Sequence, residues 1–174
     1  TEIYTLSLHD ALPILDTMPP EMLFNLAHID LTQTIISREE VYAQLPHRHE
    51  FALLDGIVHV DDVHRWMVGY KDIRDDDWWA RGHIPGRPIF PGVLMIESAA
   101  QLASYMAHRS IGGDQFWGFG GVDGVKFRQA VTPPSRLYIL AVGVEARRRR
   151  VVCATQGIVD GVQAFEARIT GMPV

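Results

Sequence analysis

Residues 82–108, which read GHIPGRPIFPGVLMIESAAQLASYMAH, decide the fold of this 174-residue chain. The first eleven of these residues include three glycines and three prolines, a composition typical of a stiff loop. From Val93 to His108 the sequence is apolar on nearly every side of a helix, and such a helix is buried inside its domain. A narrow polar stripe is the exception: Glu97, Gln101, Ser104 and His108. We therefore predict one long buried helix that follows a rigid loop.

Strand-like runs lie on both sides of this helix. Before it, a capping box at Ser37–Glu40 begins a short helix that ends near Gln44, and apolar runs predict strands at 51–60 and 66–73. After it, we predict four more strands, at 118–128, 137–146, 151–159 and 163–170. Asp160-Gly161 is the strongest short hairpin signal in the chain. One buried helix among antiparallel strands means that a sheet wraps around the helix, an α+β fold.

The overall composition excludes several classes of protein. Apolar residues make up 47% of the chain and charged residues 21%, as in ordinary globular proteins. The single cysteine, Cys153, excludes an intramolecular disulfide and fits a reducing compartment, so we expect a cytoplasmic protein. The net charge of −5, without a basic domain, argues against nucleic-acid binding. No apolar run approaches the length of about 18 residues that a membrane span needs, so we expect no membrane partner.

The N-terminal residues differ from the rest of the chain. Residues 1–14, TEIYTLSLHDALPI, look like a translated sequencing-library adapter, so we interpret them as a non-native leader; the alternative is a natural variable N-terminus. We assign residues 15–36 to an N-terminal extension and residues 37–174 to a single domain.

Glu97 is the most informative residue, because it is the only charged side chain from Pro88 to Ala107. A carboxylate on a buried helix is unfavourable unless it is paired, hydrogen-bonded or protonated. Functional acids are found in such environments, whereas the alternative is a helix edge that faces solvent. Gln101 lies one turn further along, where its amide can orient the carboxyl group.

His83 and Gly92 are the companions that a catalytic Glu97 would need. His83 begins the stiff loop, and it can meet Glu97 only if the loop folds back over the helix or a second chain supplies one of them. Gly92 leads into the helix, whose first N–H groups lack partners and can stabilise negative charge on a thioester carbonyl. The plainer alternatives are an ordinary loop histidine and an ordinary helix start. No cysteine or carboxylate set completes a site with His47 and His49, so we expect no metal.

Three other patterns carry less information. Residues 118–124 nearly match a dinucleotide-binding loop, but the spacing is wrong, and we interpret them as a glycine-rich strand. Cys153 lies among apolar residues and does not suggest a nucleophile. Arg147–Arg150 is either a basic patch for an acidic partner or a solvated hairpin tip, and the sequence leaves both open.

Residues 82–97, GHIPGRPIFPGVLMIE, resemble the 3-hydroxyacyl-acyl-carrier-protein dehydratases of fatty-acid synthesis, which have the hotdog fold. The likeness extends over about residues 37–170, with further support at 45–48, 53–55, 119–123 and 126–128. It implies that His83 and Glu97 are the catalytic pair, contributed by two protomers of a dimer. It also implies a substrate-binding role for Gly92, whose N–H would bind the thioester carbonyl, and for Gln101, which would support Glu97.

The resemblance implies dehydration of (3R)-3-hydroxyacyl thioesters on acyl carrier protein to trans-2-enoyl thioesters, a hydro-lyase reaction without a cofactor. The implied partners are the acyl carrier protein and further copies of the chain, as a dimer or a trimer of dimers. Ile84, the acidic segment 74–79 and Pro133-Pro134-Ser135 depart from the usual pattern and leave the acyl chain length open.

Three alternatives remain beside the dehydratase. A dehydratase that also isomerises its product generally carries Asp at the position of Glu97. An acyl-thioester hydrolase needs a carboxylate but not the loop at 82–92. A non-catalytic acyl-binding protein on the same scaffold would be expected to lack His83 or Glu97, and both are present.

Overall fold

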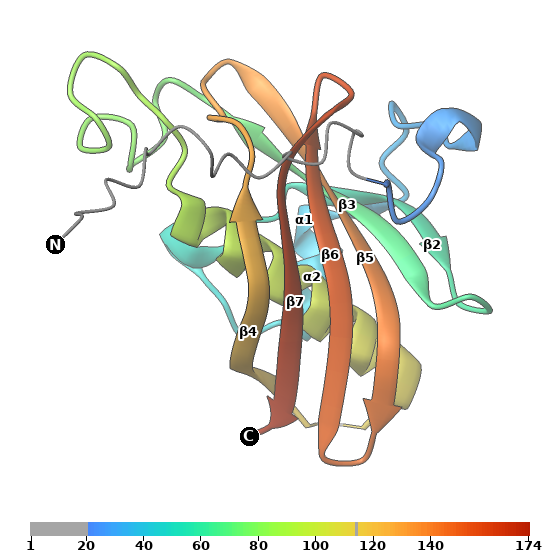
Figure 1. Ribbon diagram of the computed structural model, residues 1–174. Helices are drawn as coiled ribbons and strands as arrows, with labels where there is room; N and C mark the ends of the chain where they lie inside the picture. The colour runs from blue at the N-terminus through green and yellow to red at the C-terminus, as the bar shows by residue number, and fades with distance from the viewer. Residues whose placement is uncertain (1–20, 114) are drawn as a thin grey trace, which may run out of the picture.

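A single antiparallel sheet wraps around helix α2 (Gly92–Ile111) in the computed structural model, which describes residues 21–113 and 115–174 (Figure 1). The strand order in the sheet is β1-β2-β3-β5-β6-β7-β4, so β4 forms one edge. The strands are β1 (Ile36–Ser37), β2 (Gly56–Asp61), β3 (Trp66–Ile73), β4 (Trp117–Phe127), β5 (Ser135–Arg147), β6 (Arg150–Val159) and β7 (Val162–Pro173). The other helical elements are η1 (Leu26–His28), α1 (Arg38–Gln44) and η2 (His49–Phe51). The predicted α+β arrangement is confirmed.

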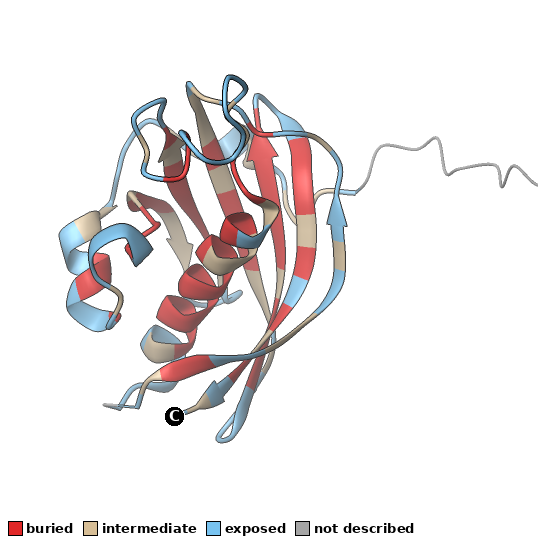
Figure 2. Ribbon diagram, turned by 90° about the vertical axis from the view of Figure 1, so that its left-hand side faces the viewer, coloured by how far each residue is buried: buried red, intermediate tan, exposed pale blue. Residues whose placement is uncertain are grey.

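Helix α2 lies in the concave side of the sheet and is buried along most of its length (Figure 2). Ala99 and Leu102 are fully covered, and they belong to one large apolar core with residues of the sheet and of α1. A helix with mostly apolar sides is stable here because the curved sheet and α1 cover different sides of it. None of the described helices is long and apolar enough to cross a membrane.

Two local sequence signals form as predicted. Ser37 caps α1 by accepting a hydrogen bond from the Glu40 N–H, while the Glu40 carboxylate accepts one from the Ser37 N–H. Asp160 and Gly161 both have positive φ angles, 50° and 76°, which is the backbone that a two-residue hairpin between β6 and β7 requires. Residues 118–124 lie within β4, as the glycine-rich strand interpretation expects.

The predicted strand at 51–60 is wrong in its first half. Strand β2 begins at Gly56, and the chain before it forms η2 and an irregular segment. The reason is that side chains satisfy this backbone: Leu53 N–H donates to Gln101 Oε1, and Leu54 N–H donates to the Tyr42 hydroxyl. A buried segment with such partners does not need a neighbouring strand. The short β1 and η1 were not predicted.

The N-terminal extension, as far as the structure describes it from residue 21, packs on the outer face of the sheet. There it covers a second apolar cluster that includes Val68 and Leu140. The Gln156 amide fixes the segment, because its Oε1 accepts from Leu23 N–H at 2.8 Å and its Nε2 donates to Glu21 O at 2.9 Å. The proposed leader, residues 1–14, lies outside the described residues.

These contacts predict that the two N-terminal segments respond differently to deletion. Removing residues 1–14 should leave the melting temperature and activity unchanged. Removing residues 1–34 should lower the free energy of unfolding by roughly 2–4 kcal/mol, because it uncovers the outer apolar cluster. Thermal and urea unfolding of both variants would measure the difference. Equal stability of the full chain and the longer deletion would contradict the packing role of the extension.

Candidate active site

His83 lies in a loop whose backbone fixes its ring. The His83 N–H donates to Trp79 O at 2.9 Å, and the Ile89 N–H donates to His83 O at 2.9 Å. The ring Nδ1 lies 2.7 Å from Ile89 O, and a carbonyl oxygen can only accept, so Nδ1 carries the proton. The Nε2 of an exposed ring is then left with a free lone pair. The ring of His83 can therefore accept a proton at Nε2.

Glu97 lies in the second turn of α2, with 24% of its side chain exposed. Its Oε1 accepts a hydrogen bond from Gln101 Nε2 at 2.8 Å, as the i, i+4 spacing predicted. The same Oε1 lies 3.4 Å from His47 Nε2. The hydrogen bond from His47 lowers the pKa of Glu97, burial raises it, and the hydrogen bond from Gln101 also lowers it. The pKa of Glu97 therefore lies below that of an ordinary glutamate. Of the possibilities considered from the sequence, the structure shows a Glu97 carboxyl group that is hydrogen-bonded to Gln101 and lies close to His47.

Gln101 is the buried support of this carboxylate, with 1% of its surface exposed. Its Nε2 donates to Glu97 and to Phe51 O at 2.8 Å, and its Oε1 accepts from the Tyr42 hydroxyl at 2.7 Å and from Leu53 N–H at 3.3 Å. These four bonds use the full capacity of the amide. The Gln101 amide therefore has no free donor or acceptor, and it fixes the position of the Glu97 carboxyl group.

His47 is the site residue that the sequence analysis missed. From the sequence it was one of two alternating histidines without a metal site and part of the family resemblance at 45–48, but it had no assigned role, because nothing in the sequence links it to Glu97. Leu45-Pro46 carries the chain from α1 to His47, whose ring packs edge-on against Phe116 at 6.0 Å between centroids. Proximity to a carboxylate far along the chain is information that only the fold supplies.

Gly92 forms the first turn of α2 with its N–H available. Pro91 precedes it without a side-chain cap, and the first hydrogen bonds of the helix come from Leu94 and Met95 N–H to Pro91 O. A side chain at Gly92 would not fit without movement, because a Cβ atom there would lie 2.7 Å from the Phe127 ring. The backbone at this helix start is thus uncapped and close to an exposed aromatic ring.

The structure separates these residues into two groups within one chain. His83 and Gly92 belong to the loop and the helix start, whereas Glu97, Gln101 and His47 form a hydrogen-bonded cluster. Within the described residues, no hydrogen bond or ion pair joins His83 to Glu97. Within one chain the imidazole of His83 and the carboxyl group of Glu97 are therefore not bonded to each other.

The profile of the FabA-like domain matches residues 45–168, which include all five of these residues. The chain belongs to the FabA-like family. The chain is 36% identical over 138 residues to the 3-hydroxyacyl-[acyl-carrier-protein] dehydratase FabZ of Mannheimia succiniciproducens. This alignment covers 78% of the present chain and 91% of the relative. It is 38% identical over 136 residues to the FabZ dehydratase of Campylobacter jejuni, in an alignment that covers 75% of the present chain and 92% of the relative. The resemblance seen at residues 82–97 is confirmed.

Solved structures confirm the hotdog fold of this FabA-like chain. The dehydratase heterocomplex ApeI:P from Xenorhabdus doucetiae matches with a TM-score of 0.65 and 18% identity, over 77% of this chain and 90% of that one. A mutant thioesterase from Pseudomonas aeruginosa matches with a TM-score of 0.62 and 16% identity, over 82% and 98%. At these identities the likeness shows the fold alone.

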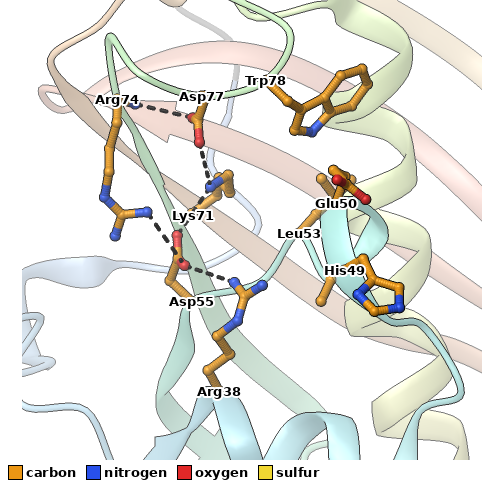
Figure 3. Close-up of a pocket in the computed structure, with 10 residues that line it drawn as sticks. Arg38, His49, Glu50, Leu53, Asp55, Lys71, Arg74, Asp77 and Trp78 are labelled. Atoms are coloured by element: carbon orange, nitrogen blue, oxygen red, sulfur yellow. Dashed lines mark hydrogen bonds and ion pairs between the residues drawn. The ribbon is translucent and has the colours of Figure 1, made fainter.

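A charged cluster anchors the segment that leads to His83 in the FabA-like chain (Figure 3). Lys71 on β3 is 5% exposed, and its Nζ lies 3.3 Å from Asp55 and 3.7 Å from Asp77. The Arg74 N–H also donates to Asp77, at 3.1 Å, and these groups line a cavity of about 330 Å³. Asp77 lies in the acidic segment that departs from the family pattern. Its turn precedes Trp79, whose carbonyl holds His83.

Loss of the buried charge of Lys71 should destabilise this anchor. Replacing Lys71 with Met keeps most of the aliphatic chain but leaves Asp77 without its cation, so we expect a loss of about 3 kcal/mol in the free energy of unfolding. Lys126 provides the matched control, because its pair with Glu166 is exposed, and Lys126→Met should cost at most about 1 kcal/mol. Urea unfolding would measure both, and equal losses would contradict the anchoring role.

Proposed function

We propose that this chain dehydrates (3R)-3-hydroxyacyl thioesters on acyl carrier protein to trans-2-enoyl thioesters in fatty-acid synthesis. The observation that carries the proposal is the Glu97 carboxylate, which the buried amide of Gln101 holds at the surface of the central helix. The FabZ dehydratase relatives and the signature at residues 82–97 supply the reaction class. Acyl carrier protein as partner and a cytoplasmic location are parts of the same proposal.

The reaction is proton chemistry that needs no cofactor. The Gly92 N–H binds the thioester carbonyl and stabilises the negative charge that develops on its oxygen, which makes the α-proton more acidic. The free Nε2 of His83 takes the α-proton as general base. Glu97 lies beside the β-hydroxyl, which leaves Cβ as water while the double bond forms between Cα and Cβ.

The separation of His83 from Glu97 in one chain supports a site that two protomers share. Strand β4 is an edge of the sheet, and the face it leaves uncovered includes Phe119 and Phe127, each 51% exposed. A long edge with exposed apolar side chains is a surface on which a second chain can pair. We assign this edge to the dimer interface.

Pairing of β4 with its copy brings the two halves of the site together. Gly92 lies at the Phe127 end of β4, whereas the cluster around His47 approaches the other end through Phe116. A two-fold axis pairs the strands antiparallel and places the Phe127 end of one chain at the Trp117 end of the other. The His83 loop of one protomer then faces the Glu97 cluster of its partner.

The direct test of the function is turnover by the purified protein. With a (3R)-3-hydroxyacyl thioester on acyl carrier protein, we expect loss of water and formation of the trans-2-enoyl thioester, which mass spectrometry detects. Release of free carrier thiol would indicate a hydrolase instead, and a 3-enoyl product would indicate an isomerase. Binding without any turnover would favour a non-catalytic acyl-binding protein.

Replacement of Glu97 with Gln tests the role of the carboxylate. The Gln side chain keeps the shape but removes the charge, so kcat should fall by roughly 10²–10⁴. Glu97→Asp retracts the carboxylate by one methylene and should keep partial activity. Steady-state kinetics, with circular dichroism to confirm folding, measures the effect. A Glu97→Gln enzyme with nearly normal kcat and much lower stability would assign Glu97 a structural role instead.

Mixing two inactive variants tests the shared site. His83→Ala and Glu97→Ala proteins should each be inactive, because both sites of each dimer lack one group. After subunit exchange, half of the dimers are mixed and each contains one intact site, so about a quarter of the wild-type activity should return. Exchange is verified by native mass spectrometry of differently labelled chains. If exchange occurs without recovery, both residues act within one chain.

A further inference from the structure

The two contacts of Glu97 fall on the same oxygen. Gln101 Nε2 donates to Oε1 at 2.8 Å, and His47 Nε2 lies 3.4 Å from Oε1. Within the described residues, no hydrogen bond reaches Oε2. One oxygen is therefore held by the protein, and the other retains its lone pairs for a ligand.

The surroundings of His47 decide which of its nitrogens carries the proton. Its Nδ1 is buried and has no hydrogen-bond partner among the described residues, so a proton there would be left unsatisfied. A proton on Nε2 instead points toward the Glu97 carboxylate. The half-buried ring, with 19% of its side chain exposed, is thus oriented as a donor to Glu97.

We propose that His47 is a positioning residue that keeps Glu97 in its carboxylate form and leaves Oε2 to face the substrate. This inference rests on the proposed dehydratase function, because it assigns the state in which Glu97 enters that reaction. A carboxylate accepts a hydrogen bond from the β-hydroxyl but has no proton to give. The sequence analysis left Glu97 open as an acid; in this arrangement it orients the leaving group.

If Glu97 gives no proton, one residue, His83, must carry the proton through the whole reaction. His83 Nε2 takes the α-proton, and the electron pair of the C–H bond forms the new double bond as the Cβ–O bond breaks. The same proton passes from His83 to the departing hydroxyl, which leaves as water and returns His83 to its starting state. Glu97 is unchanged throughout, so no proton is gained or lost overall.

Few other charged or titratable groups of the described residues face Glu97. Tyr42 of α1 approaches through Gln101, to which its hydroxyl donates at 2.7 Å. Tyr42 does not compete as a proton source, because burial raises its pKa well above the ordinary range. No lysine or arginine of the described chain forms an ion pair with Glu97. Apart from the neutral amide of Gln101, His47 is the donor that favours the charged carboxylate.

The test is the pH profile of kcat/KM for three variants. His47→Leu removes the donor, so the pKa of Glu97 should rise and the acidic limb of the profile should move to higher pH. His47→Gln restores an N–H donor at about the position of Nε2 and should return the limb toward that of the wild type. His49→Asn is the matched control, because His49 is exposed and its φ of 54° suits Asn, and it should leave the profile unchanged.

Two outcomes would overturn the proposal. A Glu97 carboxyl pKa that does not rise in His47→Leu, measured by ¹³C NMR titration, means that His47 does not hold the charge of Glu97; the titration is needed because the acidic limb also requires unprotonated His83. Movement of the alkaline limb instead means that Glu97 acts as a protonated acid. If His47→Leu does not fold, ¹³C NMR titration of Glu97 in the wild-type protein, assigned with Glu97→Gln, decides. A carboxyl pKa at or above the ordinary glutamate value overturns the proposal, and this result is obtained even if no hydroxyacyl substrate is turned over.

Discussion

The four hydrogen bonds of the Gln101 amide are the interaction on which the rest of the site depends. A polar side chain on a buried helix is tolerated only when its donors and acceptors are satisfied, and the folded chain supplies all of them. Phe51 and Leu53 provide backbone groups, Tyr42 provides a hydroxyl, and Glu97 provides the carboxylate. This network ties α2 to α1 and to the segment before β2. It also fixes the one carboxylate of the helix at the edge of the core.

The same physical requirement bears on the proposed division of the site between two chains. The helix must be covered by the sheet and by α1, which leaves its first turns and the β4 edge free for other contacts. The loop that carries His83 is anchored from β3 through Lys71 and Asp77. Within the described residues of one chain, no hydrogen bond or ion pair joins His83 to Glu97. The proposed pairing of β4 edges would bring the two residues of different protomers together.

Much of the fold was predictable because its signals are local. The apolar run after Gly92, the capping box at Ser37 and the turn at Asp160 each act within a few residues. Among the site residues, Gln101 was placed beside Glu97 because helical spacing brings i and i+4 together. The stiff loop also singled out His83 by its composition.

The remaining features depend on contacts between distant segments. The predicted start of β2 was wrong because the N–H groups of Leu53 and Leu54 donate to side chains of α2 and α1. No local sequence pattern indicates these bonds. His47 was missed for the same reason, since its partner lies on α2. The outer-face packing of the N-terminal extension depends on Gln156, on a strand far along the chain.

A chemical cross-link tests the central claim, that His83 of one protomer and Glu97 of its partner share one site. His83→Cys and Glu97→Cys proteins are mixed, allowed to exchange subunits and treated with a short bis-maleimide, while the native Cys153 is buried. We predict a covalent dimer in the mixture and none with either variant alone. A chain that carries both His83→Cys and Glu97→Cys gives the opposite test. If the linker joins the two cysteines within one such chain, and the mixture of single variants gives no covalent dimer, the account is contradicted.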